Sequence, residues 1–266
     1  MTKPLLTTLQ KTPHNEGVYI FREAASQTEL EQLLRIRYQS FLRGEWRKMT
    51  RQNQHGIDLD AFDTRATHVG LFLLEKGIEK PIGYLRFVGE EESKQANWIK
   101  SILLKYRDLN IKKTSIRFPF QSRSKFNADG EAHFNAFLKS QQNANRKVIE
   151  VSRISILENY MSCSLGMMFI NLAFAYAPVA QPDKTFFFMV KSGIEKVYAN
   201  NGAVPMTGVS IAVLDQTFYP FVATKNTIEG KNKVLLFDMA AMYQQQNCIA
   251  YNKQTQELSQ VASRNF

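Results

Sequence analysis

The stretch KVIEVSRISIL, residues 147–157, is the part of the sequence that decides the fold. It is apolar on both faces, which predicts a strand buried at the centre of a sheet. Glu150 and Arg153 interrupt this apolar pattern. Residues three apart in a regular strand face opposite sides, so these two side chains either serve two environments or are brought together by a β-bulge near Val151 and Ser152.

Further elements are predicted on both sides of this strand. The segments 67–77 and 81–89 are two strands joined by a glycine-containing turn, hence a hairpin. Apolar residues at helical spacing predict an amphipathic helix over 27–43. Other strands are expected at 18–24, at 185–190, from about 204 and at 233–240, and other helices at 98–107, 131–140, 166–177 and 194–201.

This order of elements predicts a mixed α/β protein. A hairpin followed by βα units gives a central mixed sheet with helices on both faces. Because no internal repeat or low-complexity linker is present, residues 1–266 are expected to form a single domain. That domain carries an insertion at about 89–146 and a flexible tail after 245.

Composition restricts the classes of function. The chain has 266 residues, 44% of them apolar, and can bury a substantial core. The two cysteines, Cys163 and Cys248, have no motif spacing, so neither a disulfide framework nor a metal site is predicted. The net charge of +10 favours acidic partners, which include nucleic acid, anionic lipid and acidic proteins.

No segment resembles a membrane anchor. The first 17 residues lack the apolar core of a signal peptide. The longest apolar run, 165–180, is interrupted by Asn171 and Pro178 and is shorter than the ~20 residues that a membrane span needs. We therefore expect a buried core helix there, no membrane span, and a cytoplasmic protein.

Several charged residues stand where the pattern calls for apolar ones. Arg37 follows Leu33 and Leu34 by one helical turn, which points it toward the apolar face of its helix. Arg86 lies in the middle of an apolar strand. Buried charges need partners, so these residues either form a polar site with nearby carboxylates, form a purely structural ion pair, or extend outward to solvent.

A polar site of this composition has a definite chemistry. Arginines and carboxylates together orient a zwitterion such as an amino acid, which carries one ammonium and one carboxylate. A carboxylate there can accept a proton from the ammonium and free a nucleophilic amine. Backbone N–H groups exposed by a bulge can stabilise the oxyanion of an acyl transfer.

The same residues resemble the signature of the acyl-homoserine lactone autoinducer synthases. Five short motifs occur in order, namely Arg37-xxx-Phe41, Trp46, Asp60-xx-Asp63, Gly83-Tyr84-Leu85-Arg86 and Glu150-Val151-Ser152-Arg153. The resemblance implies a GNAT-like acyl-CoA N-acyltransferase fold. It also implies catalytic roles for Glu150 and Arg153 and substrate-binding roles for Arg37, Phe41, Trp46, Asp60, Asp63 and Arg86.

Other features are more similar to N-acyl amino acid synthases. The 63 residues between Arg86 and Glu150 exceed the usual spacing of autoinducer synthases, and Thr67-His68-Val69 follows the acidic motif. The glycine-rich pyrophosphate loop of ordinary acetyltransferases is missing from 159–167, which holds one glycine and no basic residue. The resemblance therefore implies an acyl chain delivered by acyl carrier protein, whose acidic surface a +10 protein attracts.

We therefore predict transfer of a medium or long acyl chain to the amino group of an amino acid or related amine. The co-substrate is the phosphopantetheine of acyl carrier protein or acyl-CoA, with no tightly bound cofactor. The alternatives are an ordinary CoA-dependent acetyltransferase and a catalytically silent, basic nucleic-acid-binding or regulatory module. A nucleic-acid partner is the less favoured of these expectations.

Overall fold

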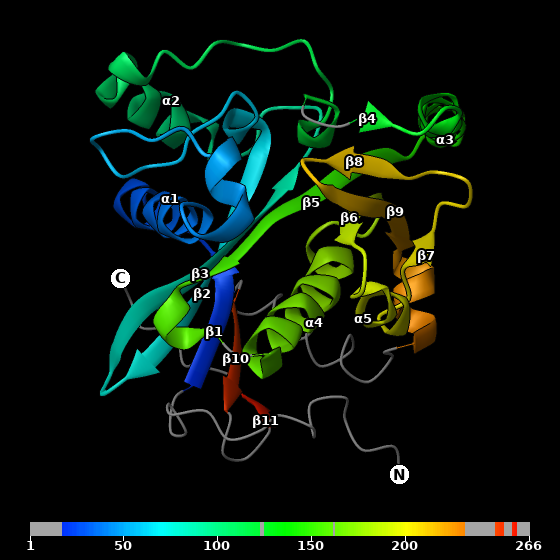
Figure 1. The fold of residues 1–266 in the computed structure, drawn as a ribbon. Helices are drawn as coiled ribbons and strands as arrows, with labels where there is room; N and C mark the ends of the chain where they lie inside the picture. Colours follow the sequence, from blue (N-terminus) through cyan, green and yellow to red (C-terminus); the bar gives the residue numbers. More distant parts are fainter. Residues whose placement is uncertain (1–17, 123–124, 162, 232–247, 253–256, 260–266) are drawn as a thin grey trace.

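The predicted central strand is present as β5 (Lys147–Ile156), in the interior of an 11-stranded sheet in the computed structural model (Figure 1). The structure describes residues 18–122, 125–161, 163–231, 248–252 and 257–259. The strands run in the order β11-β10-β1-β2-β3-β5-β6-β9-β8-β4, and β7 pairs with β9. β5 and β6 are parallel while the other pairs are antiparallel, so the sheet is mixed, as predicted.

Most predicted strands lie near their expected positions. These are β1 (Val18–Glu23), the hairpin β2 (Ala66–Glu75) and β3 (Ile78–Val88), and β6 (Lys184–Lys191). The strand expected from about residue 204 is only the short β7 (Val204–Pro205), and the strand expected at 233–240 lies outside the described residues. Strands without a prediction are β4 (Lys125–Phe126), β8 (Ile211–Val213), β9 (Gln216–Thr224), β10 (Cys248–Asn252) and β11 (Glu257–Ser259).

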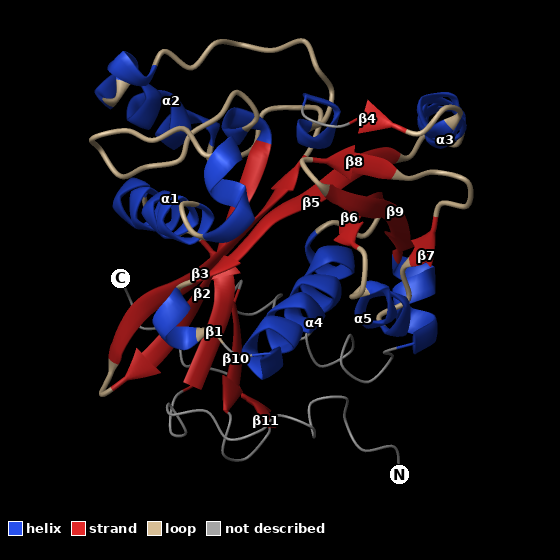
Figure 2. Cartoon of the chain, viewed as in Figure 1, coloured by secondary structure: helices blue, strands red, loops and turns tan. Residues whose placement is uncertain are grey.

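One face of the sheet is covered by α1 (Gln27–Phe41) and α2 (Ala96–Lys105) (Figure 2). The side chain of Ser26 caps α1 by accepting a hydrogen bond from the Glu29 N–H at 3.2 Å. Leu30, Leu33 and Leu34 of α1 are fully buried against the sheet, which confirms the amphipathic pattern.

The opposite face is covered by α4 (Cys163–Ala180) and α5 (Glu195–Asn200). Alternate residues of a strand face opposite sides, and on β1 Tyr19 and Phe21 pack in the α4 cluster while Ile20 packs in the α1 cluster. Helices therefore lie on both faces, as predicted. Within the described chain, no helix is long and apolar enough to cross a membrane.

The insertion at 89–146 contributes α2 and α3 (Gly130–Asn143), close to the two helices predicted there. Its aromatic residues Phe118, Phe120 and Phe134 are buried and pack with Val148 of β5 and Phe187 of β6. The insertion thus covers part of the sheet beside the ends of β5 and β6, and it supplies walls to the site described below.

Strand β5 departs from regular geometry in two ways that open a space in the sheet. Arg86 of β3 pairs with Ser152, but the next pair is Tyr84 with Ser155, so β5 carries an extra residue. This is a β-bulge, one of the two arrangements that the sequence allowed, and Arg153 within it has a φ of 62°. Pairing between β5 and β6 also ends at Val151 and Phe188, although both strands continue, so their ends separate.

Candidate functional site

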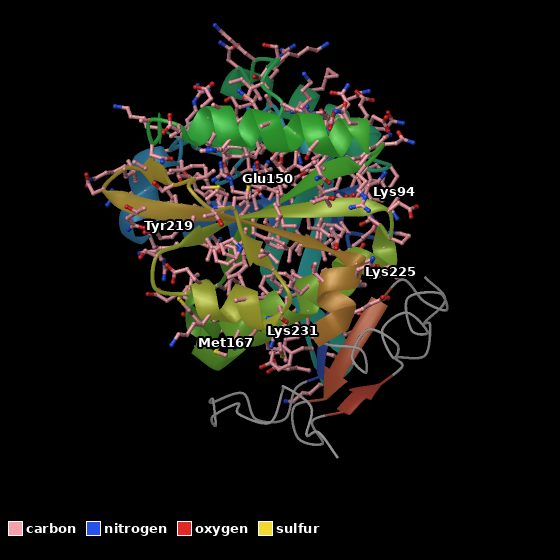
Figure 3. All side chains as sticks on the ribbon, turned by 90° about the vertical axis from the view of Figure 1, so that its right-hand side faces the viewer. Lys94, Glu150, Met167, Tyr219, Lys225 and Lys231 are labelled. Atoms are coloured by element: carbon pink, nitrogen blue, oxygen red, sulfur yellow. The ribbon has the colours of Figure 1, made fainter. Side chains whose placement is uncertain are left out.

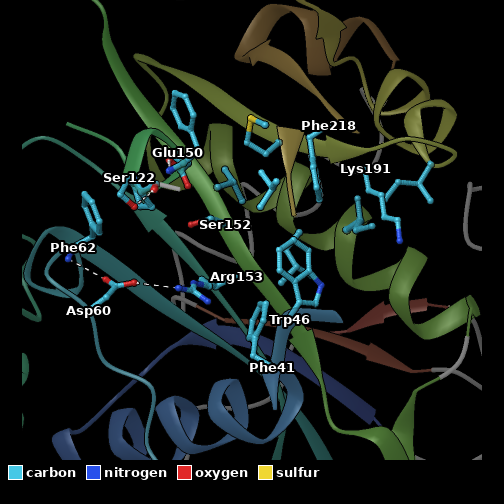
Figure 4. A pocket seen from close by; sticks show the side chains of 18 of the residues that line it. Phe41, Trp46, Asp60, Phe62, Ser122, Glu150, Ser152, Arg153, Lys191 and Phe218 are labelled. Carbon is cyan, nitrogen blue, oxygen red and sulfur yellow. Dashed lines mark hydrogen bonds and ion pairs between the residues drawn. The ribbon is translucent and has the colours of Figure 1, made fainter. Parts of the chain in front are cut away.

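A pocket of about 410 Å³ lies where β5 and β6 separate (Figure 4). Polar side chains lie on the β3 side of β5, and mostly apolar side chains lie toward β6 and β9. Its lining residues include Phe41, Trp46, Asp60, Glu150, Arg153 and Phe218. Five of the eight predicted site residues therefore line one pocket.

The other three, Arg37, Asp63 and Arg86, are fully buried behind the polar wall. The guanidinium of Arg37 donates from Nη1 and Nη2 to the two oxygens of Asp63, at 2.7 and 2.9 Å. Its Nε donates to Asp58 Oδ2 at 2.8 Å. The inward orientation predicted for Arg37 from helical spacing is confirmed, and its cost is offset by paired carboxylates.

Arg86 links this buried group to the pocket. Its Nη1 donates to Asp63 Oδ1 at 2.6 Å and to Asp60 Oδ1 at 2.8 Å. Its Nε lies 3.4 Å from the hydroxyl of Ser152 on β5. Asp60, which lines the pocket, is therefore held by an arginine that is itself held by Asp63.

The charges of this cluster are fixed by mutual attraction. Burial alone would raise the pKa of Asp60 and Asp63, but the guanidinium groups of Arg86 and Arg37 lower both, and that of Asp60 lies well below its usual range. Burial alone would likewise lower the pKa of Arg37 and Arg86, and the neighbouring carboxylates raise it instead. Two arginines and two ionised aspartates thus persist at every physiological pH.

Glu150 is in a different state. Its side chain is 2% exposed, and Oε2 accepts a hydrogen bond from the Phe120 N–H at 3.3 Å. Burial raises its pKa to about 7, against smaller opposite effects of Arg86, the Phe120 N–H and the Ser152 hydroxyl. Figure 3 shows Glu150 in the interior of the molecule, between α3 and the helices of the opposite face. A carboxyl that titrates near neutrality beside a pocket is suited to accept and return a proton.

The β-bulge brings Arg153 to the same pocket as Glu150. Its guanidinium carbon lies 5.0 Å from the centre of the Phe41 ring, which is a cation–π contact. Its Nη1 is 3.6 Å from Asp58 Oδ2, and its Nη2 is 3.5 Å from Asp60 Oδ2. Of the two arrangements that the sequence allowed, the structure therefore has the one in which a bulge brings Glu150 and Arg153 to the same environment.

The apolar half of the pocket has an aromatic wall. Trp46, on the 3₁₀ helix η1 (Gly44–Met49), packs between Phe41 and Phe218, with ring centres 5.9 and 5.8 Å apart. Met189 of β6 and Ile170 of α4 also line this half. Trp46 thus joins α1 to β9 across the separated strands.

Tyr198 of α5 lines the pocket, although no sequence pattern marks it as a site residue. Its ring packs on Phe174 and Phe188, and burial raises the pKa of its hydroxyl with no hydrogen bond contributing. It stands on a helix that was predicted correctly, but only the packing of α5 against β6 directs it to the pocket. Asp58 was also missed, although it belongs to the acidic segment that contains Asp60 and Asp63.

Basic side chains lie at two places near these elements. Arg47 and Lys48 are exposed on η1, beside the pocket residue Trp46. Lys100 and Lys105 lie on α2, where they pair with Glu92 and Glu31. Among the described residues, no group of three or more His, Cys, Asp and Glu side chains is arranged to hold a metal ion.

Comparison with solved structures bears on the fold of the chain. An N-acyl amino acid synthase from uncultured soil microbes, FeeM, superposes with a TM-score of 0.51 at 11% identity, over 83% of this chain and 98% of that one. The chain shares the GNAT-like fold of that enzyme. The CoA-dependent acyl-homoserine lactone synthase BjaI matches at 0.48 and 13% identity, over 82% and 90% of the two chains. An acyl-CoA N-acyltransferase from Pseudomonas aeruginosa matches at 0.44 and 13%, over 77% and 98%.

The likeness lies in the fold rather than in the sequence. No protein-family model matches the chain, and a search of curated proteins finds no match. The predicted fold class is confirmed at this level.

Proposed function

We propose that this protein is an N-acyltransferase. It moves a medium or long acyl chain from acyl carrier protein, or from acyl-CoA, to the amino group of an amino acid or related amine. The observation that carries the proposal is that one pocket combines a buried carboxyl titrating near pH 7 with an apolar compartment between two separated strands. The first deprotonates an amine, and the second accommodates an acyl chain.

The donor thioester occupies the apolar half in this proposal. A pocket of about 410 Å³ falls within the usual range for small-molecule sites, roughly 300–1,000 Å³. Trp46, Phe218 and Met189 offer the acyl chain a largely apolar surface. The separated ends of β5 and β6 leave backbone N–H groups on that side of β5 without a strand partner, and such groups can stabilise the oxyanion of the tetrahedral intermediate.

The acceptor occupies the polar half. Its ammonium gives a proton to Glu150, and the freed nitrogen attacks the thioester carbonyl carbon. The C–N bond forms, the C–S bond breaks, and sulfur leaves as a thiolate to which the hydroxyl of Tyr198 donates a hydrogen bond. The second proton that nitrogen loses on becoming an amide passes to the thiolate, and Glu150 releases the first, so the products are an amide, a thiol and one proton.

The remaining residues orient the acceptor. Arg153 contacts carboxylates only at 3.5 and 3.6 Å, so it retains N–H groups for a carboxylate of the substrate. Asp60, fixed by Arg86, attracts the ammonium. The N-acyl amino acid synthase of the same fold supports an amino acid as the class of acceptor.

The proposed partner is acyl carrier protein. Carrier proteins are acidic, and Arg47 and Lys48 are exposed beside Trp46, which lines the apolar half. The net charge of +10 acts in the same direction. Lys112 and Lys113, which follow α2 and are not among the lining residues, provide a matched control for charge reversal.

The test combines a product search with reconstitution. Lipid extracts of cells that overproduce the protein are compared by mass spectrometry with extracts from cells that overproduce Glu150→Gln. Purified protein is then given acyl carrier protein or CoA loaded with medium or long chains, together with amino acids and S-adenosylmethionine. We expect a new N-acyl compound that depends on Glu150, and faster turnover with the carrier-protein donor.

Other outcomes select the alternatives. Transfer restricted to acetyl-CoA would identify an ordinary CoA-dependent acetyltransferase. An absence of any acylated product, together with DNA binding that falls steeply with salt, would identify a basic nucleic-acid-binding module instead.

A further inference from the structure

His68 is a fully buried histidine whose ring bridges two parts of the molecule. It lies on β2, directly opposite Arg86 of β3. Its Nδ1 is 2.9 Å from the hydroxyl of Tyr84, and its Nε2 is 3.0 Å from the backbone carbonyl oxygen of Asp63. None of the roles proposed above uses this side chain.

The neighbouring donors determine which ring nitrogen carries the proton. Arg37 Nη1 can only donate, so the Tyr84 oxygen accepts from it at 3.0 Å. Tyr84 then donates its own hydrogen to His68 Nδ1, and Nε2–H donates to the Asp63 carbonyl. Burial, opposed in part by Asp63, lowers the pKa of His68 to about 4, so the ring stays neutral in this one tautomer.

Asp63 connects this bond to the pocket. Its carboxylate is held by Arg37 and Arg86, and its Oδ2 accepts from the backbone N–H of Asp60 at 2.8 Å. The histidine holds the main chain of the same residue. The short segment from Asp60 to Asp63 is therefore fixed at both its backbone and its side chains, and only Asp60 of the two faces the pocket.

We propose that His68, together with Tyr84, is a positioning residue for the acceptor half of the pocket. By holding the backbone of Asp63, the pair sets the place of Asp60 and the direction of the Arg86 guanidinium. The inference rests on the proposed function for its catalytic meaning, whereas the positioning itself is a property of the fold.

The arrangement is more specific than the burial of a polar residue requires. If His68 only filled the space between β2 and α1, an apolar residue would do this equally well. It would also avoid placing two ring nitrogens that need hydrogen-bond partners in the interior. Here both ring nitrogens are used, and neither bonds to the β2–β3 ladder. Both bonds lead toward the residues that shape the polar wall.

The test uses variants that remove the bonds with little change of volume. His68→Leu removes both, and Tyr84→Phe removes the hydroxyl alone. His68→Gln keeps an N–H donor at nearly the reach of Nε2 and serves as the conservative rescue. Tyr176→Phe is the matched control, because it removes a buried hydroxyl that donates to Glu23 at 2.6 Å from the opposite face of the sheet.

The first readout is amide hydrogen exchange, which needs no activity. The N–H groups of Asp60 and Phe62 are bonded to the side chains of Asp63 and Asp60, so their protection reports on the segment. We expect faster exchange over residues 60–65 in His68→Leu and Tyr84→Phe, with β2, β3 and β6 unchanged. Equal loss of protection across β2 and β3, or no change at residues 60–65, would overturn the proposal.

The second readout separates acceptor from donor. In His68→Leu, kcat/KM for the acceptor is expected to fall on the order of 10²-fold, as for a displaced reactant, while KM for the thioester stays constant. His68→Gln should recover most of this loss, and Tyr176→Phe should show none of it. A parallel rise of both KM values would overturn the proposal. A wild-type protein that acylates no amine would overturn the proposed function but leave the exchange measurement decisive for positioning.

Discussion

Replacing Glu150 by glutamine is expected to make the protein more stable and less active, both in a pH-dependent way. The substitution keeps the shape of the side chain and an oxygen that accepts from the Phe120 N–H, but it removes the ionisable group. The pKa of Glu150 is raised from 4.5 to about 7 by burial. The charged form is thus disfavoured in the folded protein and not in the unfolded chain.

The size and sign of the stability effect follow from that shift. Between pH 4.5 and 7 the folded protein keeps a proton that the unfolded chain releases, so wild-type stability falls as pH rises through this window. At about 1.36 kcal/mol per pKa unit, the loss is about 3 kcal/mol. The glutamine variant has no such loss. Its stability relative to wild type should therefore be about 2.5 kcal/mol more favourable at pH 8 than at pH 5, where the unfolded carboxyl is already mostly ionised.

The assays are urea unfolding at both pH values and turnover at saturating substrate. Wild-type kcat should rise roughly tenfold from pH 6 to pH 8, as a base of pKa about 7 becomes ionised. The variant should show no such rise and should turn over about 10²–10⁴-fold more slowly. Unchanged relative stability at the two pH values together with near-normal turnover would refute the reasoning. Asp60 would then be the next candidate for the catalytic base.

Three further predictions concern the buried cluster, the donor and its partner. Arg37→Met leaves the Asp63 carboxylate without its main counter-charge. Urea unfolding is expected to show a free energy of unfolding lower by about 3–5 kcal/mol. An unchanged free energy of unfolding would mean that the ion pair does not stabilise the fold. Tyr198→Phe should lower kcat by about 10²-fold with an alkyl thioester but little with an aryl thioester, whose thiolate needs less stabilisation. Equal loss for both would exclude Tyr198 as a hydrogen-bond donor to the leaving sulfur. Reversing Arg47 and Lys48 to glutamate should raise KM for acyl carrier protein more at low salt than at high salt, with KM for acyl-CoA as the control.

Local patterns were sufficient to predict the elements that surround the site. The β2–β3 hairpin, the amphipathic helix α1 and the buried strand β5 follow from periodicity and turn residues. The bulge was predictable because two charges three residues apart in a buried strand need a local irregularity to share one environment. Arg37 and Arg86 occupy positions where the sequence pattern predicts apolar side chains, and this identified them as members of one polar group.

What the sequence left open depends on distant contacts. β10 pairs with β1, more than 200 residues earlier in the sequence, and no local pattern in so short a segment predicts such pairing. β9 contains Pro220 and alternates poorly, so it lacked a strand signal although it pairs along β6. The sequence also did not show which charged residues line the pocket, as Asp60 and Glu150 do, and which lie behind them, as Arg86 does. That division depends on how α1 packs against β3.

The pairing of β10 with β1 has a consequence for co-translational folding. β1 (Val18–Glu23) gains its outer neighbour only when residues 248–252 have been synthesised. Until then the nascent sheet presents the free backbone of β1 as an edge, which is a template for wrong pairing. The far separation of the two strands also raises the contact order, which slows folding. Because the two strands lie side by side, a circular permutant that joins them by a short linker would complete this edge early in translation.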